Sequence, residues 1–129
     1  MNTILVEVSV GELLDKISIL EIKKEKIEDS EKLKFINDEY EILKDQLDKN
    51  VKFDEKIDKL FQSLKEINAK LWIIEDDKRL CEKNSDFSEK FIKLSRDVPF
   101  LNDDRGKIKL EITHHAGSKI KEIKKYTSY

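Results

Sequence analysis

The sequence predicts an all-α protein, an antiparallel helical bundle that contains a long, coiled-coil-like helical hairpin. Charged residues make up 42% of the 129 residues and hydrophobic residues 38%, whereas the chain has only three glycines and one proline. Long helices with solvated faces have this composition, because lysine and glutamate favour helices and breakers are rare. Apolar residues also recur every three or four positions, which places them on one side of a helix. We therefore expect one helical domain over residues 1–129, with a basic tail at 118–129.

The N-terminal segment predicts an extended start followed by a first helix. Residues 3–8, TILVEV, favour a short strand or an extended arm. Ser9 and Glu12 have the spacing of a capping box, in which each side chain bonds to the backbone amide of the other. The first helix should therefore span about residues 10–28.

Two longer amphipathic helices follow and should pair with each other. Asp29 or Ser30 can cap the second helix, and Asp54 can cap the third. At 1.5 Å per residue the third helix would be roughly 40 to 45 Å long. Because a short turn joins the two helices, we expect them to form the antiparallel hairpin. Their apolar residues, at alternating spacings of three and four, are Leu33, Ile36, Tyr40, Leu43 and Leu47, then Ile57, Leu60, Leu64, Ile67, Leu71, Ile74 and Cys81.

The C-terminal part predicts two shorter helices. Asp86 and Glu89 have the spacing of a second capping box after a polar break. Pro99 should stop or kink the helix that follows, since proline lacks an amide hydrogen and crowds the preceding turn. A last helix should restart at about residue 102 and end at Gly117, because glycine readily takes the left-handed conformation that closes many helices.

Composition also indicates a compartment. The single cysteine, Cys81, cannot form an internal disulfide and fits a reducing environment. No run approaches the roughly 18 apolar residues that a membrane-spanning helix needs, and the N-terminus lacks the pattern of a signal peptide. We therefore expect a cytoplasmic protein with no membrane partner.

Several charged residues fall on helix faces that are otherwise apolar. Glu21 and Lys24 lie within the apolar arc of the first helix, and Arg105 lies within that of the last. On the third helix, Trp72 belongs to a polar row beside the apolar seam. Burying a lone charge costs several kcal/mol, so such residues usually find partners or line a cleft. The candidate ligand-binding residues are Glu21, Lys24, Trp72, Glu75, Arg79, Asn102 and Arg105.

A purely structural interpretation of these residues stays open. Glu75 and Arg79 lie four residues apart and can pair with each other on one helix. Lys24 can lay its methylene groups on apolar neighbours while its ammonium group reaches water. Trp72 can fill space beside the leucine seam.

Familiar catalytic and metal-binding patterns give no assignment. Glu12 with Asp15 has the Glu-x-x-Asp spacing of magnesium-dependent helical phosphohydrolases, but 28 acidic residues produce such pairs by chance. The adjacent His114 and His115 point about 100° apart on a helix, which suits a helix end better than a shared metal. The chain has neither a glycine-rich phosphate loop nor a nucleophile motif. We expect no metal and no cofactor, and we assign no catalytic residue.

Charge is unevenly distributed along the chain. Residues 105–129 contain seven lysines and arginines against two glutamates, so the remainder is acidic. No helix-turn-helix pattern accompanies this basic end, which argues against nucleic acid as a partner. The tail is expected to dock internally or onto a protein.

The sequence resembles a known family in four places. These are VSVGELLDKISILEIK at 8–23, INAKLWIIEDDKR at 67–79, the Asn102-Asp103 pair followed by Arg105, and the Gly117-Ser118 step before the tyrosine-ending tail. They resemble a family of small all-helical bacterial proteins of unknown function. The resemblance implies a setting beside, or fused to, glycosyltransferases of surface-polysaccharide synthesis, and it implies no catalytic residues.

Two departures from the family pattern bear on a ligand site. The chain has Pro99 and Phe100 where a tyrosine is expected before the Asn-Asp step, and Thr113 where an asparagine is expected. If those polar side chains hold a ligand in relatives, they do not do so here.

Two classes of function follow from the sequence. The first is a helical interaction or accessory protein, with a protein partner or a second copy bound at a second apolar face that includes Ile19 and Ile22. The alternative is a small all-α enzyme or binding protein, phosphohydrolase-like or mutase-like, that uses the candidate residues on an anionic small molecule.

Overall fold

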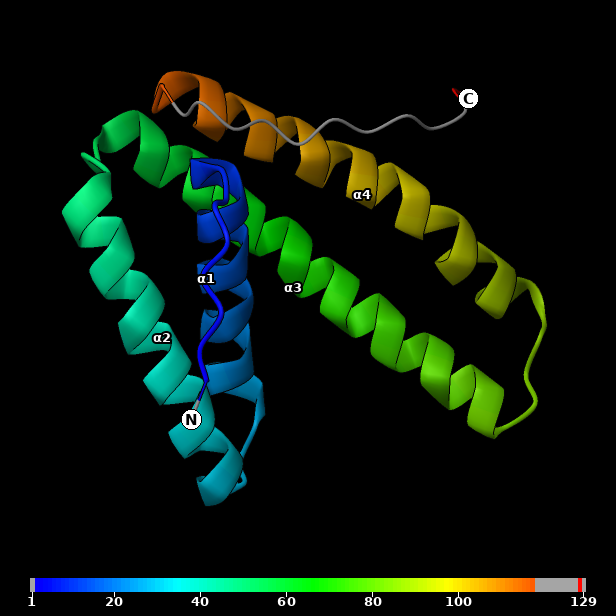
Figure 1. Cartoon of the computed structure of the whole chain (residues 1–129). Helices are drawn as coiled ribbons and strands as arrows, with labels where there is room; N and C mark the ends of the chain where they lie inside the picture. Colours follow the sequence, from blue (N-terminus) through cyan, green and yellow to red (C-terminus); the bar gives the residue numbers. More distant parts are fainter. Residues whose placement is uncertain (1, 118–127, 129) are drawn as a thin grey trace.

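The protein folds into four helices in the part of the chain described by the structure, a computed structural model: residues 2–117 and residue 128. The helices are α1 (Val10–Lys26), α2 (Ser30–Asn50), α3 (Glu55–Lys83) and α4 (Glu89–His115) (Figure 1). The all-α class is thus confirmed. The possible N-terminal strand is not seen, because residues 2–9 have no regular secondary structure. A strand needs a neighbouring strand to pair with, and the described chain offers none.

The first three helices begin at the caps that the sequence predicts. The Ser9 hydroxyl accepts a hydrogen bond from the Glu12 amide at 3.1 Å, and the Asp54 carboxylate accepts one from the Ile57 amide at 2.8 Å. The Asp29 carboxylate likewise accepts from two amides at the start of α2. Only half of the first capping box forms, since the Glu12 carboxylate reaches Lys109 of α4 instead of the Ser9 amide.

The helices pair differently from the expected order. α1 contacts each of the other three helices, whereas α2 contacts only α1. The most extensive contact joins α3 to α4, so the long antiparallel hairpin consists of these two helices and not of α2 and α3 (Figure 1). Periodicity shows that a helix has an apolar face, but it does not show which neighbour covers that face. Here α1 lies between α2 and the hairpin and covers both.

The hydrophobic core sits where α1 meets the turn between α2 and α3. All four helices contribute to it, and Val51 in the turn packs against it. Its fully or largely buried members are Leu14, Ile17, Leu47, Ile57, Phe61, Leu64 and Ile112. Ile22 of α1 is also buried within the chain, at 1% exposure, so it cannot belong to an exposed partner-binding face as expected.

α4 is one continuous helix, which corrects two expectations. Pro99 lies inside it and neither ends it nor separates two shorter helices. Partly buried residues on both sides of the proline, among them Leu94 and Leu101, belong to the same helix. Tertiary contact with α3 therefore outweighs the loss of one backbone hydrogen bond. The N-cap is Ser88, and the Asp86 carboxylate accepts from the Ser88 amide at 3.1 Å instead of capping the helix.

α4 ends at His115, and Gly117, two residues later, has the left-handed φ of 71° that was predicted to close the last helix. Residues 118–127 and 129 of the basic tail lie outside the described residues, so its expected docking stays a prediction. None of the helices in residues 2–117 combines the length and the apolar character required to cross a membrane.

Gly11 allows α1 and α4 to approach closely. A Cβ atom there would overlap the carbonyl oxygen of Lys109 and lie 2.7 Å from the Thr113 hydroxyl oxygen. The Gly11 amide donates a hydrogen bond to that hydroxyl at 3.0 Å. The glycine is thus required by space and not by backbone conformation.

We expect Gly11→Ala to lower the free energy of unfolding by about 2 kcal/mol, because the helices must separate to admit the methyl group. Urea titration measures this. Gly117→Ala is the comparison: nothing lies within 4 Å of its added Cβ, but its positive φ makes alanine cost about 1 kcal/mol. A Gly11→Ala protein as stable as the wild type would show that α1 and α4 are not in this close contact.

Candidate functional site

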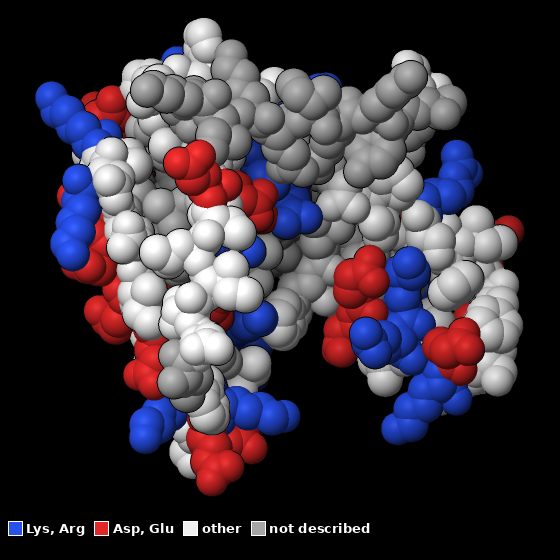
Figure 2. All heavy atoms as spheres, viewed as in Figure 1, with Lys and Arg blue, Asp and Glu red and all other residues white. Residues whose placement is uncertain are grey.

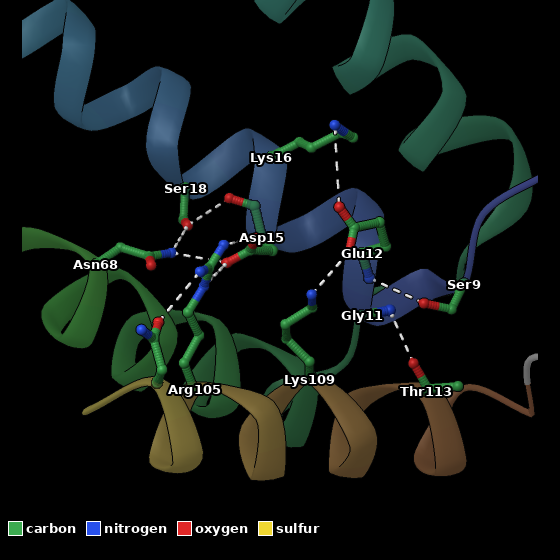
Figure 3. A network of polar contacts seen from close by, with 11 residues as sticks. Ser9, Gly11, Glu12, Asp15, Lys16, Ser18, Asn68, Arg105, Lys109 and Thr113 are labelled. Atoms are coloured by element: carbon green, nitrogen blue, oxygen red, sulfur yellow. Dashed lines mark hydrogen bonds and ion pairs between the residues drawn. The ribbon is translucent and has the colours of Figure 1, made fainter. Parts of the chain in front are cut away.

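A row of polar residues on α1 faces the α3–α4 hairpin. Glu12, Asp15 and Ser18 are spaced by three residues and so lie on one side of the helix (Figure 3). The Glu12 carboxylate accepts a hydrogen bond from the Lys109 ammonium at 2.7 Å and also lies 3.9 Å from Lys16. These contacts extend the junction of α1 and α4 that begins at Gly11.

Asp15 is the centre of this row and is 1% exposed. The Arg105 guanidinium donates two hydrogen bonds to its carboxylate, at 2.9 Å from Nε and 2.5 Å from Nη2. The Asn68 amide of α3 donates to the same carboxylate at 2.9 Å and to the Ser18 hydroxyl oxygen at 2.8 Å. The Ser18 hydroxyl in turn donates to the Asp15 carbonyl at 2.7 Å. One carboxylate thus joins α1, α3 and α4.

The charge state of Asp15 follows from these partners. Burial by itself raises the pKa of the carboxyl group, because water no longer stabilises the anion. The hydrogen bonds from Arg105 and Asn68, together with the positive charges of Arg105 and Lys109, outweigh that effect and hold the pKa below its ordinary value. Asp15 is therefore an anion at neutral pH and neutralises Arg105.

An open groove begins beside this network. It has a volume of about 330 Å³ and lies between α1 and the hairpin, with Asn68 and Arg105 at its inner end. Figure 2 shows a hollow between the α1–α2 pair and the far end of the hairpin, and acidic and basic side chains alternating over that far end. The groove is lined by Ile19, Asn68, Leu71, Trp72, Glu75, Asp76, Arg79 and Arg105.

The structure brings together most of the candidate residues. Trp72, Glu75, Arg79 and Arg105 line the same groove. Asn102 lies one turn before Arg105, and its side-chain oxygen accepts from the Arg105 guanidinium at 3.5 Å. Among the described residues, no ion pair within 4.0 Å links Glu75 to Arg79, so the expected pairing along the helix does not form.

Glu21 and Lys24 lie in a separate cluster between α1, α2 and α3. The Glu21 carboxylate accepts from the Tyr40 hydroxyl at 3.3 Å and lies 3.2 Å from the Lys65 ammonium. The Lys24 ammonium sits over the Tyr40 ring, 3.9 Å from its centroid. Lys65 also pairs with Glu25 at 2.8 Å. Glu21 and Lys24 are therefore not among the residues that line the groove beside Asp15.

A family comparison covers almost the entire chain. A model of DUF6165, a family of unknown function, matches residues 4–129. The chain belongs to DUF6165. The match includes all four helices and both sides of the groove. No curated protein and no solved structure matches this DUF6165 chain. Membership therefore identifies relatives and leaves the reaction and the partner to be argued from the molecule.

Sequence reasoning missed the residue at the centre of the DUF6165 network. The sequence presents Asp15 only as half of an acidic pair, because it lies outside the leucine-rich arc of α1. A second stripe on α1 contained the signal, since Gly11, Asp15, Ser18 and Ile22 recur at spacings of four, three and four. All four are buried, which shows that α1 packs on two sides. Small residues in such a stripe allow a close helix–helix approach.

The described residues of this DUF6165 chain offer no cluster of three or more histidine, cysteine or carboxylate side chains that could hold a metal ion. His115 lies in the last turn of α4, and its Nε2 atom is 2.7 Å from a carboxylate oxygen of Asp54, the N-cap of α3. This contact joins the start of α3 to the end of α4, at the end of the hairpin that lies near the core.

A second groove lies between α3 and α4, and we call it the outer groove. It has a volume of about 470 Å³ and is lined mainly by apolar residues, together with one basic and one acidic residue. Ile73 and Phe100 line it while remaining 51% and 54% exposed. Its lining residues are Lys70, Ile73, Ile74, Asp97, Phe100 and Leu101.

We expect Asp15→Asn to lower the free energy of unfolding by about 3 kcal/mol at neutral pH, because it leaves Arg105 without its buried anion. The pKa of Asp15 is lower in the folded state, so its contribution is complete above the unfolded value of about 3.9 and is lost as the pH falls through the folded value. The stability difference between wild type and variant should therefore shrink as the pH falls from about 5 to below 3.

Urea unfolding at a series of pH values measures this difference. Asp38→Asn is the control, since Asp38 is exposed on α2 and its replacement should change stability by less than about 0.5 kcal/mol at each pH. A difference between wild type and Asp15→Asn that stays constant down to about pH 3 would contradict the role of an ionised Asp15.

Proposed function

We propose that this protein is a helical interaction module and that its binding surface lies on the far half of the α3–α4 hairpin. One observation supports this proposal above all. Between residues 69 and 108, Cys81 is the only buried residue. The far half of the hairpin thus has almost no core of its own, and it extends beyond α1 and α2 (Figure 1).

Large apolar side chains on this half of the hairpin remain exposed. Ile73 and Phe100 line the outer groove, and each has a further half-exposed residue two turns away along its helix. We name the set Ile73, Leu80, Ile92 and Phe100 the outer face. Helices in proteins are stabilised mainly by packing of an apolar face. Within residues 2–117, the far halves of α3 and α4 pack on each other and leave these four side chains about half exposed, and a bound partner would cover them.

The proposal includes a biological setting. The protein is a cytoplasmic accessory protein linked to surface-polysaccharide or nucleotide-sugar metabolism; the resemblance, which implies a setting beside glycosyltransferases, supports the link, and the composition supports the location. An interaction module suits that setting, because a protein that only binds another protein needs no catalytic residue.

Photo-crosslinking in the cells that make the protein tests the proposal. A photoreactive amino acid at position 73 or 100 should give a discrete adduct, whose second component and contact peptides mass spectrometry identifies. The control is the same amino acid at Lys59, which is exposed on the near half of α3. Combining Phe100→Asp with the photoreactive residue at position 73 should remove the adduct. Equal labelling from all three positions, or adducts that survive Phe100→Asp, would overturn the proposal.

We propose a second candidate function, binding of a small molecule in the groove beside Asp15. The Trp72 ring and the Arg79 guanidinium line this groove, while Arg105 is already held by Asp15. Two arginines and two acidic residues line the groove, so its formal charges cancel. The suited ligand has a planar apolar part for Trp72 and one anionic group for Arg79.

A thermal-shift screen with nucleotides, nucleotide sugars and dicarboxylates tests this second function. We expect a stabilising compound to lose its effect in Arg79→Ala, whose unliganded melting temperature should stay near the wild-type value. Arg105→Ala should instead lower the melting temperature with or without the compound, because it breaks the contact with Asp15. The absence of any stabilising compound, or a full ligand effect in Arg79→Ala, would exclude this function.

A further inference from the structure

We propose that the partner of the outer face is a second copy of this chain, bound with its α3 helix antiparallel to the first. This inference rests on the proposed interaction function and names the partner for the same surface. The reason is the order of charged and apolar residues along α3.

Four residues form a continuous row on the outer side of α3. Lys70, Ile73, Asp77 and Leu80 are spaced by three, four and three residues, which keeps them on one face of a helix. Two of them, Lys70 and Ile73, line the outer groove together with Ile74. The row therefore places a cation about one turn before an apolar pair and an anion about one turn after it.

This order is self-complementary under a two-fold axis. Suppose that the axis passes between the two α3 helices at the level midway between Ile73 and Ile74. Ile73 of one copy then lies opposite Ile74 of the other. Lys70 of each copy then lies opposite Asp77 of its partner, so the contact contains two equivalent opposite-charge pairs. Two-fold interfaces use one patch twice and need such an arrangement, whereas an unrelated partner would not require it.

The neighbouring helix fits the same axis. α3 and α4 run antiparallel, and Ile73 and Ile74 share the outer groove with Phe100 and Leu101. Phe100 therefore lies at the level of the axis and meets the Phe100 of the second copy. Its ring is 54% exposed in the single chain, and an aromatic pair at the centre of an interface contributes more than its area alone.

Parallel pairing does not offer the same match. If the two α3 helices ran in the same direction in register, Lys70 would face Lys70 and Asp77 would face Asp77. Like charges placed directly opposite each other cost binding energy. The charges thus select the antiparallel arrangement.

Sedimentation equilibrium of the full chain tests the inference. The wild type should show a reversible dimer with twice the chain mass of 15.3 kDa. Lys70→Asp and Asp77→Lys should each raise the dimer dissociation constant at least about tenfold, since each puts like charges opposite each other. The double variant, Lys70→Asp with Asp77→Lys, should restore wild-type association because both pairs are reversed.

Lys59→Asp is the matched control, because it reverses a charge on the same helix outside the row and should leave association unchanged. Circular dichroism of each variant confirms that the helices are intact. A chain that stays monomeric at all concentrations, or a double variant that associates no better than either single variant, would overturn the second-copy arrangement.

The two proposals fail in different ways. If crosslinks from position 100 identify a different protein while the purified chain is a monomer, the second copy is wrong and the interaction surface is retained. If position 100 gives no specific adduct and the chain is a monomer, both are wrong.

Discussion

The buried carboxylate of Asp15 meets the guanidinium of Arg105 where α1 packs against the α3–α4 hairpin, and the other contacts of that junction are arranged around this pair. Burying two charges is costly unless geometry and further hydrogen bonds compensate for lost water. Asn68 and Ser18 supply those bonds, and no buried side-chain oxygen or nitrogen in the described residues lacks a partner. Removing Asp15 would take away the acceptor that Asn68 and Arg105 share, so the network acts as a unit and fixes the position of α1.

The chain is stabilised unevenly along its length. On one side of α1, aliphatic residues such as Leu14 and Leu64 form the core with α2 and the start of α3. On the other side, Asp15 and its partners join α1 to the middle of the hairpin. Beyond that point the hairpin has almost no buried residues, and it presents apolar side chains such as Phe100 to water. The half of the molecule that contains the core and the Asp15 network is thus well packed, whereas the far half of the hairpin is not. Segments that bind ligands or partners are often found in such less stable parts of a protein.

Local signals in the sequence predicted local structure well. Ser9, Asp29 and Asp54 cap helices as expected, because capping depends on residues only two or three positions apart. The prediction that Pro99 separates two shorter helices was wrong. The free energy that the proline costs is smaller than the stabilisation from the contacts that keep α4 continuous. The role of Asp15 depends on contacts between residues more than 50 positions apart in the sequence, as in the hydrogen bond from Asn68. No periodicity within one helix contains that information, so only part of the site was predictable.

Cys81 can serve as a probe of local opening in the hairpin. It is the only thiol in the chain, and it lies buried at 3% exposure in the far half of the hairpin, where no other residue is buried. Because the side chain is buried, a reagent that alkylates thiols can reach its sulfur only when the structure around it opens locally. The speed of alkylation therefore counts the openings of this part of the molecule, much as amide hydrogen exchange does for backbone groups. A partner bound on the outer face would stabilise this part of the hairpin, so it should slow the alkylation of Cys81.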